Sequence, residues 1–173
     1  MVDITTADIV IRLTVATVVS TLIGVEREWH EKPAGIRTNV MVGLGACLIT
    51  LASVQTPSLW PEFRPIDPGR IAAQIVSGIG FIGAGAILRS NQGAIVGLTT
   101  AATLWVVAGL GMAVGFGFYV EALVAAILVF FTFIVLGQMV DRVRHVRHEK
   151  YPLVTPKTTS ESRSEGVSAG EHE

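Results

Sequence analysis

The residues best suited to chemistry lie in a short charged stretch between two long apolar runs. They are Glu26, Arg27, Glu28, Arg37 and Asn39. Pro33 and Gly35 break the chain here, so the runs on either side should form a hairpin that brings Glu26 back towards Arg37. Charges close to lipid are costly unless they are paired or hydrated, and an arginine–carboxylate pair is bidentate and directional. We expect one charged cluster, which either clasps two helices together or contacts a partner protein or an ion.

A glycine pattern further along the chain has the letters of a nucleotide-binding motif. Residues 78–83, GIGFIG, match the G-x-G-x-x-G fingerprint. That motif needs a preceding strand, a helix that begins at the glycines, and an acidic residue roughly 20 positions further on. The residues before Gly78 favour helix, and Leu98 to Ala102 include no acid. We therefore interpret these glycines as helix-packing residues.

Polar residues also lie inside the apolar runs and at one of their ends. Those at membrane depth are Gln74, Ser77, Thr99, Thr100 and Thr103. A glutamine amide in lipid needs a partner, so we expect Gln74 to meet Thr100 and Thr103 across a helix interface. The alternative is that each threonine bonds a carbonyl of its own helix. Asp67 and Arg70 are placed at the outer mouth, where Asp67 either caps a helix or helps to bind a cation.

No set of residues indicates an enzyme. The sequence has no Ser-His-Asp candidates, no phosphate loop and no Cys/His cluster, and its single cysteine, Cys47, lies in an apolar run. His145 and His148 stand among arginines, a pattern typical of a solvated basic stretch. We expect no cofactor. Mg²⁺ is the ion to consider, because its sites need only one or two carboxylates and leave weak traces in a sequence.

The elements that position these residues are apolar runs of membrane length. Half of the 173 residues are hydrophobic and only 16% are charged, a composition typical of an integral membrane protein. We predict an all-α, polytopic membrane helix bundle of about five transmembrane helices. They are placed at residues 8–25, 38–54, 68–88, 96–114 and 120–140. Asp3 and Asp8 argue against a signal peptide, and Arg12 is expected to reach the membrane interface.

The third predicted helix carries the most small residues and is expected to be the centre of the bundle. Its packing residues are Gly78, Gly80, Gly83, Ala84 and Gly85, with Ser77 one turn earlier. Small residues let helix backbones approach closely in lipid, where no hydrophobic effect draws helices together. We expect this helix to be buried on most sides. Gly111 and Gly115 should pack the fourth helix, and the fifth should face lipid.

Basic residues give the orientation and the domain limits. Lys and Arg concentrate in the loops after the first and third predicted helices and in the segment after the fifth. Such loops stay in the cytoplasm, so the N-terminus is predicted outside and the C-terminus in the cytoplasm. Residues 1–145 are predicted to form a transmembrane domain. Residues 146–173, rich in Ser, Thr, Glu, Gly and Pro, are predicted to be a disordered cytoplasmic tail.

Four motifs follow one another within residues 20–120. They are GVERE at 24–28, AGIRTN at 34–39, DPGRIAAQIVSGIGFIGAG at 67–85 and GLTTAATLW at 97–105. Together they resemble the MgtC/SapB family of bacterial inner-membrane proteins. The resemblance is to the short form, a transmembrane domain without the soluble C-terminal domain of longer members. Thr99 stands where some members carry Asn.

The resemblance implies a multi-pass protein of the bacterial inner (plasma) membrane, linked to magnesium homeostasis and, in some pathogens, to virulence. Its best-known members are described as accessory or regulatory proteins that restrain the rotary ATP synthase. We therefore expect a non-enzymatic regulator, with a small ion or solute transporter or channel, for example for Mg²⁺, as the alternative. The expected partners are the lipid bilayer, another membrane protein and further copies of the chain in a homo-oligomer such as a dimer. No basic and aromatic pattern supports nucleic-acid binding.

Overall fold

The computed structural model describes residues 4–59, 67–89 and 94–136, and the fold is all-α as predicted. The helices are α1 (Thr6–Trp29), α2 (Ile36–Leu59), α3 (Pro68–Ala86), α4 (Leu98–Phe116) and α5 (Tyr119–Phe131). Two short strands, β1 (Leu88–Arg89) and β2 (Ile95–Val96), pair antiparallel between α3 and α4. The chain divides into two units, Met1–Phe131 and Thr132–Glu173. In the second unit the described part is a short π-helix, η1 (Thr132–Leu136).

The start of α1 shows why a helix begins where it does. Thr5 and Asp8 form a capping box: the Asp8 backbone N–H donates to Thr5 Oγ1 at 3.2 Å, and the Thr5 backbone N–H donates to Asp8 Oδ2 at 2.9 Å. These bonds satisfy amides that the first helical turn leaves without a partner. α1 then continues to Trp29, beyond the predicted end at residue 25, so Glu26 and Glu28 lie on a helix and not in a loop.

The central helix is α4, and the prediction that the third helix is central is wrong. α4 packs against α1, α2, α3 and α5, and its buried residues are Thr100, Thr103, Leu104, Val107, Ala108, Leu110, Gly111, Val114 and Gly115. On α3 only Ala72, Ile79 and Gly83 are buried where side chains are described. The other predicted packing residues, Ser77, Gly78, Gly80, Ala84 and Gly85, are exposed, because no element of the described chain lies opposite them.

The closest helix contacts involve glycines of α2 and α4. A Cβ atom on Gly111 would overlap the Gly43 carbonyl oxygen, and a Cβ atom on Gly115 would lie 2.7 Å from Thr50 Cβ. A Cβ atom on Gly43 would in turn overlap Ser20 Oγ of α1. These positions admit only hydrogen, so three helix backbones pack tightly at this seam. The predicted packing role of Gly111 and Gly115 is confirmed.

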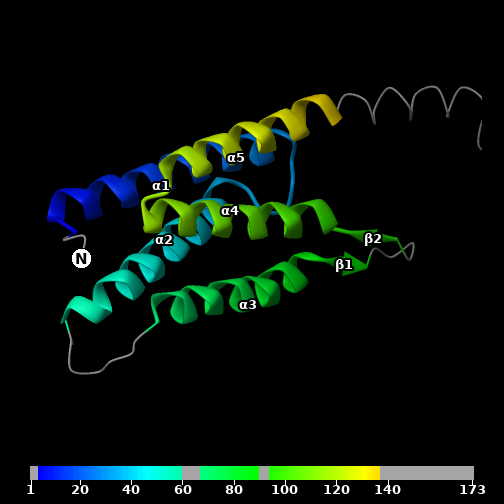
Figure 1. The fold of residues 1–173 in the computed structure, drawn as a ribbon. Coiled ribbons are helices and arrows are strands. Elements are labelled where there is room, and N and C mark those ends of the chain that lie inside the picture. The colour runs from blue at the N-terminus through cyan, green and yellow to red at the C-terminus, as the bar shows by residue number, and fades with distance from the viewer. Residues whose placement is uncertain (1–3, 60–66, 90–93, 137–173) are drawn as a thin grey trace, which may run out of the picture. The chain divides into compact units, whose positions relative to one another are not determined.

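The helices have the character of membrane spans. Three described helices are long and apolar enough to cross a bilayer, at Thr6–Trp29, Ile36–Thr56 and Leu98–Phe116, and α3 and α5 contribute shorter apolar stretches. α5 buries Ala122 and Ala126 and exposes its large apolar side chains, as predicted for a lipid-facing helix. Figure 1 shows the α1–α2 turn and the α3–α4 turn at the same end of the bundle. The predicted tail, residues 146–173, and the basic stretch with His145 and His148 lie outside the described residues.

Candidate functional site

The charged cluster begins with an ion pair on the last turn of α1. Arg27 Nε donates to Glu26 Oε2 at 2.7 Å, and Arg27 Nη2 donates to Glu26 Oε1 at 3.2 Å. The two side chains are only 6% and 13% exposed. The predicted partner of Glu26 was Arg37, and this pairing is wrong: because α1 extends through Glu26, its neighbour Arg27 reaches the carboxylate first. Arg37 is exposed and forms no ion pair with the described residues.

Two further side chains of the cluster fix the turn between α1 and α2. Glu28 Oε2 accepts a hydrogen bond of 2.9 Å from the Ile36 backbone N–H, so a carboxylate of α1 caps the start of α2. Asn39 is fully buried, and its Nδ2 donates to the Ala34 and Gly35 carbonyls at 2.9 and 2.8 Å. Asn39 Oδ1 is buried and has no hydrogen-bond partner among the described residues. Of the five residues predicted to form one cluster, Glu28 and Asn39 bond the turn between α1 and α2, whereas Glu26 and Arg27 pair within α1.

A polar hollow of about 600 Å³ lies at this hairpin. It is lined by Glu28, Glu31, Lys32, Pro33, Gly35, Arg37 and Thr38. Two acids and two bases therefore face one solvent-open space on a backbone that hydrogen bonds hold in place. Within the described part of the chain, no group of three or more His, Cys, Asp or Glu side chains could hold a metal ion. The hollow is suited to ion-paired contact with a charged surface.

The polar residues at membrane depth do not form the predicted cluster. Thr103 is buried, and its Oγ1 donates to the Thr99 carbonyl of its own helix at 2.8 Å, the alternative considered from the sequence. Thr100 is buried on the same helix, whereas Thr99 and Ser77 are exposed. Gln74 is exposed on α3 and bonds neither Thr100 nor Thr103. The expected contact of Gln74 with Thr100 and Thr103 is wrong, because both threonines are buried on α4 whereas Gln74 is exposed on the α2 side of α3.

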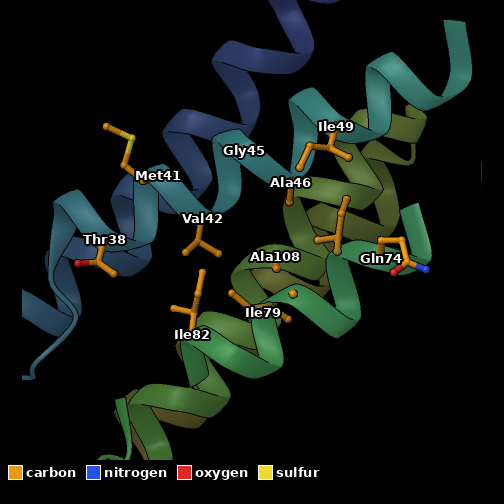
Figure 2. Close-up of a pocket in the computed structure, with 12 residues that line it drawn as sticks. Thr38, Met41, Val42, Gly45, Ala46, Ile49, Gln74, Ile79, Ile82 and Ala108 are labelled. Atoms are coloured by element: carbon orange, nitrogen blue, oxygen red, sulfur yellow. The ribbon is translucent and has the colours of Figure 1, made fainter. Parts of the chain in front are cut away.

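Gln74 instead lines an apolar groove between α2 and α3. The groove has a volume of about 570 Å³ and lies between side chains of α2, among them Met41, Val42 and Ile49, and side chains of α3, among them Ile79 and Ile82. Ala108 of α4 also lines it. Figure 2 shows the amide side chain of Gln74 on the α3 side of this mostly apolar space and the hydroxyl side chain of Thr38 on the α2 side.

Three more polar residues of interest lie at the start of α3 and near the end of α4, away from the hairpin. Asp67 is the N-cap of α3, as predicted, since its Oδ1 accepts from the Gly69 backbone N–H at 2.9 Å. Arg70, on the first turn, is exposed. The sequence predicted that Arg12 reaches the membrane interface but did not predict its partner: Arg12 Nη1 donates to the Gly115 carbonyl at 2.7 Å and so anchors α1 to the C-terminal end of α4. The available signal was a charge inside an apolar run, combined with the free carbonyls at a helix end before Gly117.

The profile of the MgtC family matches residues 13–142, which is most of the chain. The chain belongs to the MgtC family. It is 44% identical over 124 residues to the protein named SapB of Bacillus subtilis, a match covering 70% of this chain and 53% of SapB. It is 43% identical over 137 residues to protein MgtC of Salmonella typhimurium, covering 79% of this chain and 56% of that protein.

A third relative is named a putative magnesium transporter, YhiD of Escherichia coli. It is 40% identical over 158 residues, which cover 90% of this chain and 73% of YhiD. The chain spans about half the length of the SapB and MgtC relatives. No solved structure matches it. Family membership and apolar helices of membrane length together identify the chain as a membrane protein.

Proposed function

We propose that this chain is a non-enzymatic accessory protein of the bacterial inner (plasma) membrane that supports growth under magnesium limitation by contacting another membrane protein. The observation that carries the proposal is the polar hollow at the α1–α2 hairpin, where Arg37 is exposed on a backbone held by Glu28 and Asn39. A surface that is already ordered loses little entropy on binding, which favours association. The name of one relative, the putative magnesium transporter YhiD, supports the link to magnesium.

The position of the hollow fits contact from the cytoplasmic side. The hairpin contributes Arg27, Lys32 and Arg37, and basic loops stay in the cytoplasm. The proposed orientation therefore has the N-terminus outside and the hollow at the inner surface. Charges at the edge of an interface mainly steer encounter and reject wrong partners, so Arg37 is proposed to select an acidic patch on the partner.

Transport of Mg²⁺ is the second candidate, supported by the name of YhiD. Buried hydroxyl groups on α1 and α2, those of Ser20, Thr50 and Ser53, could contribute to a polar route through the bundle. However, Thr50 Oγ1 donates to the Ala46 carbonyl at 2.8 Å, and Ser20 lies against Gly43 with no room for a Cβ atom between them. This close packing of α1, α2 and α4 favours the accessory function over an ion path along their seam.

Two measurements test the proposal. In cells that lack the native gene, Arg37→Glu should abolish complementation of growth in low magnesium, whereas Arg37→Lys, which keeps the charge, should largely retain it. Both variants should reach the wild-type amount of folded protein, because Arg37 is exposed and forms no ion pair with the described residues. The wild-type chain in liposomes with a Mg²⁺ gradient should carry no flux. Mg²⁺ flux would overturn the proposal in favour of transport. Growth of the Arg37→Glu variant at the wild-type rate would show that the accessory function does not depend on the hollow.

A further inference from the structure

We propose that α3 is the dimerisation helix: two copies of the chain pack in parallel along a stripe of Gln74, Gly78, Phe81 and Gly85, with the two Gln74 amides hydrogen-bonded to each other. The inference stands independently of the hairpin hollow. It rests on the face of α3 that the described chain leaves open, on the spacing of the stripe, and on the chemistry of Gln74.

The open face of α3 is wide and has an unusual profile. Phe81 is 84% exposed, the most exposed of the large hydrophobic side chains that the structure describes. It stands between Gly78 and Gly85, where an added Cβ atom would meet nothing within 4 Å. A large ring flanked along the helix by two bare backbone positions provides both a protrusion and a recess on one surface. Such a surface is complementary to a second copy of itself.

The spacing of the stripe is that of a helix–helix seam. Gln74, Gly78, Phe81 and Gly85 follow one another at intervals of four, three and four residues, the repeat that keeps one face of a helix turned towards a partner in a left-handed pair. The buried residues Ile79 and Gly83 occupy the opposite side of α3. In such a pair, each Phe81 ring enters the hole bordered by Gly78 and Gly85 of the other copy, and the glycines allow the backbones to approach.

Gln74 identifies the occupant as a second copy. All copies enter the membrane in the same orientation, so a two-fold axis between them runs along the membrane normal and each residue meets its own counterpart at the same depth. A glutamine amide both donates and accepts, so it is complementary to itself. Gln74 has no hydrogen-bond partner among the described residues, and lipid chains offer none. A polar residue in an apolar seam also fixes its register.

The apolar groove gives the second copy room beside the seam. Gln74, Gly78 and Ile82 line the groove on its α3 side, with Met41 and Ile49 on the α2 side. Side chains that flank the seam in one copy can therefore pack into the groove of the other copy, which has a volume of about 570 Å³. The stripe and the groove form one continuous surface.

Cysteine crosslinking in the membrane tests the predicted seam with a matched control. Gly78→Cys lies on the stripe, and Gly80→Cys lies two residues away, about 160° further round the helix and at nearly the same depth. Both positions are exposed and have nothing within 4 Å of an added Cβ atom, so neither variant should disturb the fold. Upon mild oxidation Gly78→Cys should form a disulfide-linked dimer at least ten times faster than Gly80→Cys. The wild-type chain, whose Cys47 is buried, should form none.

A second measurement tests the glutamine pair. In liposomes, energy transfer between labelled copies should follow a monomer–dimer equilibrium, and Gln74→Leu should weaken the dimer about three- to thirtyfold, the range expected for one interhelical hydrogen bond in lipid. Equal crosslinking of Gly78→Cys and Gly80→Cys, or a wild-type chain that stays monomeric at every density, would overturn the proposal. The second result would leave lipid or an unlike helix as the occupant. Neither result bears on the growth test of Arg37.

Discussion

Two helices of this protein are rich in glycine, and the structure uses them in opposite ways. On α4, Gly111 and Gly115 lie against the backbone and side chains of α2. On α3, Gly78, Gly80 and Gly85 have open space where a side chain would be. α3 also has the longer run of small residues, yet α4 is the buried helix.

The difference shows that small residues permit close packing but do not cause it. A glycine lowers the distance at which two helices can meet, and which helices meet depends on the rest of both surfaces. α4 combines its glycines with large buried side chains such as Leu104 and Val107, which fill the space around each close contact. α3 has fewer such residues, so its glycine face remains available to another molecule.

The largest expected effect comes from adding the same side chain to both helices. Gly111→Val places its Cβ atom on the Gly43 carbonyl, so α2 and α4 must separate. Overpacking of a dense interior costs typically 1–3 kcal/mol and sometimes more, and we expect the upper end of this range here because the obstacle is backbone. Gly80→Val meets nothing within 4 Å and should leave stability nearly unchanged. Thermal unfolding in detergent measures both.

Equal losses in these two variants would show that α3 is packed as tightly as α4 and would contradict the comparison. If neither variant loses stability, α2 and α4 can separate at no cost in free energy of unfolding. A Gly80→Val chain that unfolds normally but grows poorly in low magnesium would assign a function to the side of α3 that carries Gly80.

A smaller effect is expected from the arginine associated with each helix. Arg12 donates to the Gly115 carbonyl at the end of α4, whereas Arg70 is exposed on the first turn of α3. A hydrogen bond from a charged donor contributes about 1.5–3 kcal/mol, so Arg12→Met should lower the free energy of unfolding by roughly that amount. Arg70→Met should change it by less than about 0.5 kcal/mol, as surface substitutions usually do. Denaturant titration of the two variants side by side provides the measurement, and a larger loss for Arg70→Met would contradict the assignment.

The sequence was sufficient for the fold class and for local helix signals. Long uncharged apolar runs predict membrane-spanning helices, because only a helix satisfies all its backbone hydrogen bonds within one segment. Asp67 before Pro68 predicted the start of α3, because an acid at the N-cap and proline at the first position fit the free amides there. The pair Gly111 and Gly115 predicted a close contact that the structure confirms.

The errors on α3 have a common cause, which is that helical periodicity does not say which face of a helix has a neighbour. The faces of α3 that carry Gln74 and Gly80 look suited to packing, but α2 and α4 meet α3 along Ala72, Ile79 and Gly83. The partner of Glu26 was misassigned because α1 ends later than its charges suggest, and helix ends are the least certain feature of a sequence. The partner of Arg12 could not be predicted, because the Gly115 carbonyl is distant in sequence and only the tertiary fold brings it close.

The smallest expected effect concerns the end of α3 and separates a structural role from a magnesium role. Asp67 Oδ1 accepts from the Gly69 amide, so Asp67→Ala should cost about 1 kcal/mol, whereas Asp67→Asn keeps an acceptor and should cost only a few tenths. The Asn variant nevertheless removes a full charge from the proposed outer mouth. If Asp67 serves only as the cap of α3, Asp67→Asn will support wild-type growth in low magnesium, and this is the result we expect, because the carboxylate is already engaged by its own helix. Growth that fails with Asp67→Asn at a normal unfolding temperature would instead give the charge a role in attracting a cation, and α3 would then have a polar function at the end opposite the hairpin.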